Sequence, residues 1–201
     1  MEECKMSIVI AVKDKGRVMF GADTQITTGN LKYCPTSESN LKITKMPHGI
    51  LIGRSGLLNV ANILTSNPKW FAKLSDEDLS KRFLVERITP RLAKELKDDD
   101  LLYKEGLPGI EMEASFLIAQ KDKLFFIHQS FAVFEVPFFS AIGSGSFSAE
   151  ATFNDETDHR CTRERILSAL KNAAAFDTSV SAPFVLTDTE KLEYEFVEEN
   201  Q

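Results

Sequence analysis

Cysteine is scarce in this sequence, and its few cysteines lie far apart. The 201 residues contain Cys4, Cys34 and Cys161, with no Cys-x-x-Cys pair among them. A zinc site or a disulfide-stapled secreted domain needs several cysteines at short, regular spacing. We therefore expect a protein of a reducing compartment, the cytoplasm, without a structural metal.

Long apolar runs and an excess of positive charge are also missing. No apolar stretch approaches the roughly 18 residues of a membrane-spanning helix. Residues 1–6, Met-Glu-Glu-Cys-Lys-Met, lack the basic and apolar regions of a secretory signal. The formal net charge is -6 at pH 7, whereas a general nucleic-acid surface needs a basic footprint. We therefore expect neither a membrane nor a nucleic acid as partner.

Motifs for metal ions and nucleotides are not found either. The histidines, His48, His128 and His159, do not have the spacing of metal ligands. The segment 143–145, Gly-Ser-Gly, lacks the lysine and the spacing of a phosphate-binding loop. The sequence therefore predicts no metal and no organic cofactor.

The chain does contain short apolar segments that are grouped by type. Residues 7–12 and 17–22 read as two buried strands joined by a turn. Further strands are expected at 24–28, 41–46, 50–53, 114–119, 123–128, 131–139, 183–186 and 192–196, helices at 57–67, 75–97, 149–153 and 162–176, and a loop at 31–40. Ser75, followed by three acidic residues, predicts the start of the longest helix, and Pro90 predicts a kink in it. This order of blocks favours an α+β fold over a βαβ crossover fold.

Several of these segments together resemble the proteasome β-subunit family, and in particular the bacterial peptidase that partners an ATPase ring. The segments are Ser-Ile-Val-Ile-Ala-Val at 7–12, Gly-Arg-Val-Met-Phe-Gly-Ala-Asp-Thr-Gln-Ile-Thr-Thr-Gly-Asn at 16–30, Lys-Ile at 42–43, Ser-Gly at 55–56 and Ala-Ile-Gly-Ser-Gly at 141–145. The resemblance implies a four-layer αββα sandwich of the N-terminal nucleophile hydrolase type. It implies one peptidase domain over 7–201, preceded by an extension or propeptide at 1–6.

The resemblance also assigns roles to individual residues. Ser7 is the nucleophile once Met1–Met6 is removed; Asp23 and Lys42 support it, Gly56 lends its N–H to the oxyanion hole, and Ser144 and Asp177 steady the terminal amine. The implied partners are identical subunits in a ring, a polypeptide substrate and an ATPase ring that feeds it. The chain itself carries no separate signal for the ATPase.

The chemistry of an N-terminal nucleophile accounts for these residue types. A serine hydroxyl is a weak nucleophile until a base takes its proton. A free α-amine, with a reference pKa of about 7.7–8.0, can be that base. A nearby lysine favours the neutral form of the amine, and an aspartate keeps the lysine in place. A backbone N–H at the oxyanion is commonly worth roughly 2.7–4 kcal/mol.

The sequence departs from the family pattern in four places. The nucleophile position holds Ser7 instead of threonine, and residue 6 is methionine instead of the glycine of self-processed propeptides. Asp23 and Lys42 are a few residues further apart than in the family, with the insertion in the loop 31–40. The segment after Asp177, Thr-Ser-Val-Ser-Ala, lacks the family's glycine, so that either Ser179 or Ser181 takes the place of its serine.

Three functions remain open at this point. In the first, an internal start at Met6 followed by methionine removal exposes the amine of Ser7, and the chain cleaves peptides. In the second, the extension stays in place and the chain is a non-catalytic scaffold subunit of the same fold. In the third, the same chemistry serves a small-amide acylase.

Overall fold

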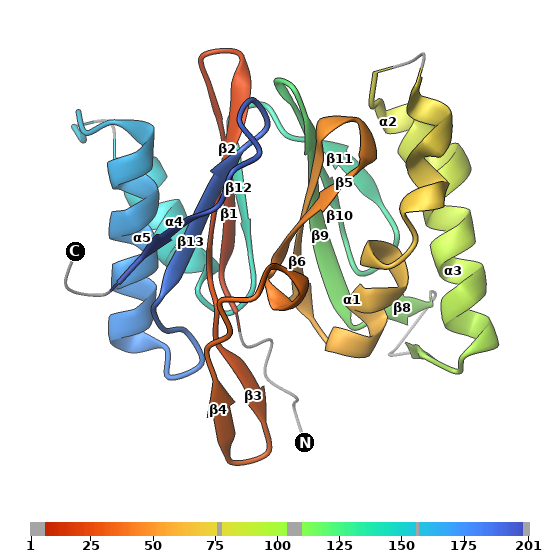
Figure 1. Cartoon of the computed structure of the whole chain (residues 1–201), viewed down its shortest axis with the longest axis horizontal. Helices are drawn as coiled ribbons and strands as arrows, with labels where there is room; N and C mark the ends of the chain where they lie inside the picture. The colour runs from red at the N-terminus through yellow and green to blue at the C-terminus, as the bar shows by residue number, and fades with distance from the viewer. Residues whose placement is uncertain (1–6, 76–77, 104–109, 156, 199–201) are drawn as a thin grey trace.

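The computed structural model describes residues 7–75, 78–103, 110–155 and 157–198. Two antiparallel five-stranded sheets lie face to face, and helices cover the outer face of each sheet (Figure 1). The predicted α+β class and the four-layer αββα sandwich are thus confirmed. None of the described helices is long and apolar enough to cross a membrane.

Each sheet has a long central hairpin or strand pair flanked by shorter strands. The first sheet has the order β12 (Phe139–Ile142), β1 (Val9–Asp14), β2 (Arg17–Asp23), β13 (Phe184–Asp188), β14 (Glu195–Val197). The second has the order β11 (Val133–Glu135), β10 (Lys123–Ile127), β9 (Ala114–Gln120), β6 (Ile50–Gly56), β5 (Ile43–Met46). The helices are α4 (Ser146–Phe153) and α5 (Thr162–Phe176) beside the first sheet, and α1 (Leu58–Thr65), α2 (Lys81–Phe83) and α3 (Thr89–Asp98) beside the second.

Strand β1 is buried on both faces, which explains its uninterrupted apolar sequence. Val9 and Ala11 belong to the apolar cluster between the two sheets. Ile8 and Ile10 belong to the cluster between the first sheet and α5. Side chains of a strand alternate between its faces, so burial of both faces requires apolar residues at every position. Ser7 therefore directly precedes a firmly held segment.

The long helix begins later than predicted. Its N-cap is Ser80, whose hydroxyl accepts a hydrogen bond from the N–H of Phe83. Ser75 instead ends a 3-10 helix (Pro68–Ser75), and the acidic residues 76 and 77 lie outside the described residues. Between α2 and α3 the helix passes through a π-helical stretch (Leu84–Ile88) just before Pro90, where proline supplies no N–H.

The prediction of a single strand at 131–139 is wrong. The segment contains the end strand of one sheet, β11, and the start of the end strand of the other, β12, so the chain crosses between the sheets here. Pro137 lies between the two strands, and a residue without an N–H cannot continue a ladder. A run of apolar residues alone does not reveal this change of sheet.

The predicted loop at 31–40 is only partly a loop. Its first residues form β4 (Leu31–Tyr33), which pairs with β3 (Ile26–Thr28) around Gly29 and Asn30 in a projecting hairpin (Figure 1). A short 3-10 helix (Glu38–Asn40) follows. Residues 102–103 and 111–112 form a further ribbon, β7 (Leu102–Tyr103) and β8 (Glu111–Met112).

Candidate active site

The backbone of Ser7 is held by the glycine-rich turn that leads into α4. The Ser7 carbonyl accepts a hydrogen bond of 3.2 Å from the N–H of Gly145, and Ser7 is only 4% exposed. Gly143 approaches so closely that a Cβ on it would overlap the Ser7 carbonyl. Its φ of +99° is also a conformation that favours glycine.

Alanine at Gly143 is therefore expected to destabilise the protein by more than about 1 kcal/mol, since both the positive φ and the overlap oppose a side chain. Gly16→Ala is the matched control, because Gly16 has a φ of +84° but no atom within 4 Å of an added Cβ. Urea unfolding of both variants measures the difference. Equal losses of stability in the two would contradict a special contact at Gly143.

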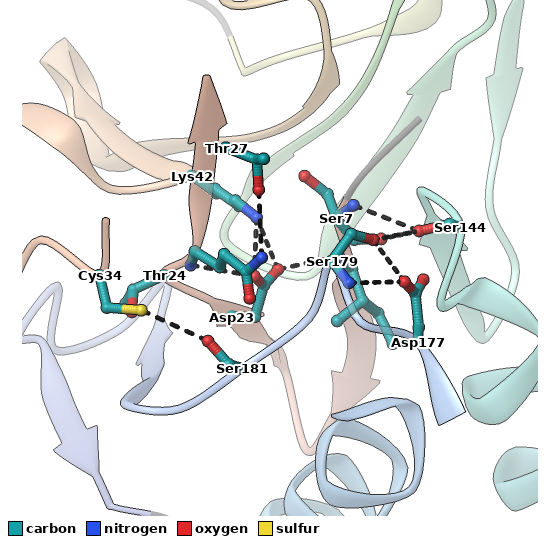
Figure 2. Close-up of polar contacts among 12 residues, drawn as sticks. Ser7, Asp23, Thr24, Thr27, Cys34, Lys42, Ser144, Asp177, Ser179 and Ser181 are labelled. Atoms are coloured by element: carbon teal, nitrogen blue, oxygen red, sulfur yellow. Dashed lines mark hydrogen bonds and ion pairs between the residues drawn. The ribbon is translucent and has the colours of Figure 1, made fainter. Parts of the chain in front are cut away.

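Asp23 is the most buried carboxylate of the site, and its oxygens are fully used. Nζ of Lys42 lies 2.8 Å from each oxygen. The N–H of Ile8 donates to Oδ1 at 2.9 Å, and the N–H of Gln25 donates to Oδ2 at 3.0 Å. Asp23 therefore ties the start of β1 to Lys42, which directly precedes β5, the edge strand of the opposite sheet (Figure 2).

Burial dominates the ionisation of this pair. It raises the pKa of Asp23 and lowers the pKa of Lys42, while their mutual attraction and hydrogen bonds oppose both shifts. The charge of Arg54 adds to the lowering of the Lys42 pKa. The two short contacts with Asp23 favour the charged form of Lys42, and a charged lysine disfavours a proton on a neighbouring amine.

A second polar chain begins at the backbone nitrogen of Ser7. This N–H donates to Oγ of Ser144 at 3.3 Å, and Ser144 Oγ lies 3.3 Å from Oγ of Ser179. Ser179 in turn donates to Oδ1 of Asp177 through its hydroxyl and, at 2.9 Å, through its N–H (Figure 2). Ser181 points elsewhere, to Sγ of Cys34. Of the two serines that the sequence left open, Ser179 is therefore the one in contact with Ser144.

This chain also sets the ionisation of Asp177. Burial is the largest single influence and acts to raise its pKa, but hydrogen bonds with Ser144 and Ser179 and the charge of Lys42 outweigh it. The pKa of Asp177 consequently lies below its ordinary value. An ionised Asp177 orients the two serine hydroxyls toward itself, so that Ser144 can accept a hydrogen bond from the nitrogen of Ser7.

A cavity of about 130 Å³ opens beside Ser7. Its wall includes Lys42 and Gly56, together with three residues that the sequence analysis did not single out, namely Gln25, Arg54 and Ser55. Gly56 has a φ of +108°, and a Cβ there would collide with the Glu113 carbonyl. All six candidate residues thus lie in one region, around Ser7 and its backbone. The one sequence feature that could have pointed to Arg54 as a site residue is its charge at the end of an apolar strand.

The described residues contain no group of three or more His, Cys, Asp or Glu side chains arranged to hold a metal ion. The site is made of hydroxyl, amine, carboxylate and backbone N–H groups.

A sequence model described as "Proteasome subunit" matches residues 6–178. The chain belongs to the proteasome subunit family. It is thus related to the threonine-type endopeptidases.

Individual relatives agree with the proteasome family assignment over nearly their full lengths. The chain is 28% identical to the ATP-dependent protease subunit HslV of Cytophaga hutchinsonii over 192 residues, 92% of this chain and 97% of that protein. The solved structure of Thiobacillus denitrificans BPH superposes with a TM-score of 0.71 at 24% identity, covering 92% of this chain and 98% of that one. The eukaryotic HslV of Trypanosoma brucei gives 0.66 at 19% identity, covering 90% and 98%.

Proposed function

We propose that Ser7, once it is the first residue, is the nucleophile of a proteasome-type peptidase that cleaves polypeptides inside a ring of identical subunits. The observation that supports this most directly is the hydrogen bond between the Ser7 nitrogen and Ser144 Oγ. It places that nitrogen in a polar network beside a buried Lys42–Asp23 pair and a cavity.

The reaction would proceed in two halves. Oγ of Ser7 attacks the carbonyl carbon of the scissile bond, and the α-amine of the same residue accepts the hydroxyl proton. The N–H of Gly56 stabilises the negative oxygen of the tetrahedral intermediate. The amine then donates its proton to the leaving nitrogen, and water hydrolyses the resulting ester by the same steps. Lys42 keeps the amine in its basic form, and Asp23 holds Lys42.

The free amine is a strict requirement of this proposal. A Ser7 nitrogen in a peptide bond to Met6 has no available lone pair and cannot act as the base. Initiation at Met6, followed by removal of the methionine before the small Ser7 side chain, would supply the amine. Residues 1–6 are then an extension that the active domain, 7–201, lacks.

The assembly of subunits and the ATPase partner are proposed from the relatives and from the exposed surface of the chain. Phe138, Phe147 and Phe176 are 75%, 76% and 90% exposed, which is unusual for phenylalanine and consistent with contacts between subunits. The name of the Cytophaga relative, an ATP-dependent protease subunit, supports an ATPase as partner. The few, widely spaced cysteines support a cytoplasmic location.

Comparing two forms of the chain tests this function. A form that begins at Ser7 should hydrolyse fluorogenic peptides and fluorescent casein, whereas a form that begins at Met1 should not, although both should unfold at the same urea concentration. The intact mass of protein purified from the native host tells which form occurs there. A chain beginning at Met1 in the host would favour the scaffold function. Cleavage of small amides without cleavage of peptides by the Ser7 form would favour the acylase.

A further inference from the structure

Three buried side chains around the cavity have polar atoms without partners. Arg54, Ser55 and Gln25 are 7%, 5% and 4% exposed and all line the cavity beside Ser7. Within the described part of the chain, Nε of Arg54, Oγ of Ser55 and Oε1 of Gln25 make no hydrogen bond. Buried polar atoms are normally paired, so three in one wall indicate a polar ligand that completes them.

The charge of Arg54 indicates that this ligand is an anion. Its Nη2 donates to the Leu41 carbonyl at 3.3 Å, but no carboxylate among the described residues forms an ion pair with it, and burial alone lowers its pKa. Asp23 cannot serve as its counter-ion, because Lys42 and two backbone N–H groups already occupy both of its oxygens. The cavity therefore contains one uncompensated positive charge, which favours an anion and disfavours a cation.

The size of the cavity further restricts the ligand. Its volume of about 130 Å³ is well below the roughly 300–1,000 Å³ of pockets for whole small molecules. It suits one side chain. Ile26 and Leu57 supply an apolar part of its wall, which matches the methylene groups of a side chain that carries a polar end.

We propose that this cavity is a specificity pocket for an acidic side chain of the substrate. The carboxylate pairs with the guanidinium of Arg54 and accepts a hydrogen bond from the Ser55 hydroxyl, while the carbonyl of the same substrate residue lies between Ser7 and Gly56. Oε1 of Gln25 remains free to accept an N–H of the substrate backbone. The inference rests on the proposed peptidase function and specifies its substrate class: polypeptides cut after glutamate or aspartate.

The test uses the chain that begins at Ser7 and four blocked fluorogenic peptides that differ only in the residue before the cleaved bond. Glutamate, glutamine, leucine and lysine are compared by kcat/KM. Loss of a charge-assisted hydrogen bond in a buried site changes such a ratio by on the order of tenfold to a hundredfold, so glutamate should exceed its neutral isostere glutamine by that factor. The lysine peptide should be the slowest of the four.

Variants assign the preference to its residues. Arg54→Met, which keeps a long side chain without the charge, should abolish the preference for glutamate over glutamine and leave the leucine peptide cleaved. Ser55→Ala should reduce the preference in part, because Arg54 stays in place. Arg82→Met is the matched control, since Arg82 is an exposed arginine paired with Glu86 far from this wall, and it should leave the order of the peptides unchanged.

The outcomes separate this inference from the proposed function. Cleavage of the leucine peptide at a rate equal to or above that of the glutamate peptide overturns the acidic pocket and leaves the peptidase intact. Failure of all four peptides, with the Ser7 terminus confirmed by mass, counts against the peptidase. The pocket is then tested by calorimetry on the Ser7→Ala variant with acetylated tripeptide amides ending in glutamate or glutamine. Equal affinities for the two would overturn the inference, and at least tenfold tighter binding of the glutamate peptide would support it.

Discussion

Asp23→Asn is expected to lower the free energy of unfolding by about 3–5 kcal/mol and to abolish peptide hydrolysis. The substitution leaves the ammonium of Lys42 buried without its counter-ion, 5% exposed and with both of its short contacts weakened. It also weakens the hydrogen bonds that hold the N–H groups of Ile8 and Gln25. Urea unfolding followed by circular dichroism measures the first effect, and a fluorogenic peptide measures the second.

A double variant separates the structural from the catalytic part of this effect. Asp23→Asn combined with Lys42→Met removes both charges, so much of the lost stability should return, because a buried ion pair can often be replaced by uncharged groups at little cost. Activity should stay absent. Asp78→Asn, which breaks an exposed pair with Lys121, should leave the unfolding midpoint unchanged. Wild-type stability in the single Asp23 variant would contradict a buried charged pair.

Ser7→Ala in the chain that begins at residue 7 is expected to reduce kcat by on the order of 10⁶-fold, as removal of a serine nucleophile does in other hydrolases. Stability should not change, because the contacts that hold Ser7 are made by its backbone nitrogen and carbonyl. A chain that unfolds like the wild type but no longer cleaves the peptide would assign the attack to Oγ.

Ser7→Thr is the conservative companion of that variant. Threonine keeps the hydroxyl and adds a methyl group that restricts χ1, and it is the residue usual at this position in the proteasome family. We expect the Ser7→Thr variant to keep its activity.

Hydrolysis that survives in Ser7→Ala at the wild-type rate would point to a different nucleophile or to a contaminating peptidase. Mass spectrometry of a covalently trapped chain would identify which of the two is present.

The parts of the fold that could be predicted have a strong local pattern. The helix at 162–176 was placed correctly at both ends, since its apolar residues recur at helical spacing between polar flanks. The first two strands followed from an apolar run and a turn, and they carry the most specific part of the family resemblance. The resemblance, in turn, implied that Ser7, Asp23 and Lys42 act together.

The parts that could not be predicted depend on contacts between distant residues. The change of sheet between β11 and β12 depends on which strands they pair with, and the sequence at 131–139 does not contain that information. Ser179 was distinguished from Ser181 only by its position beside Ser144, 35 residues away. Arg54 was not singled out at all, because its burial comes from contacts with other segments, such as the Leu41 carbonyl.

Among the described residues, the contacts that hold Ser7 in place come from positions after it in the sequence. Gly145 binds its carbonyl, Ser144 accepts its N–H, and Asp23 accepts the N–H of the next residue. Under the proposed mechanism, a gene of this type would gain or lose catalysis when its initiation codon moves, with the folded domain unchanged. Among related genes, the site of translation initiation would then distinguish active copies from silent ones, even where every residue of the site is the same.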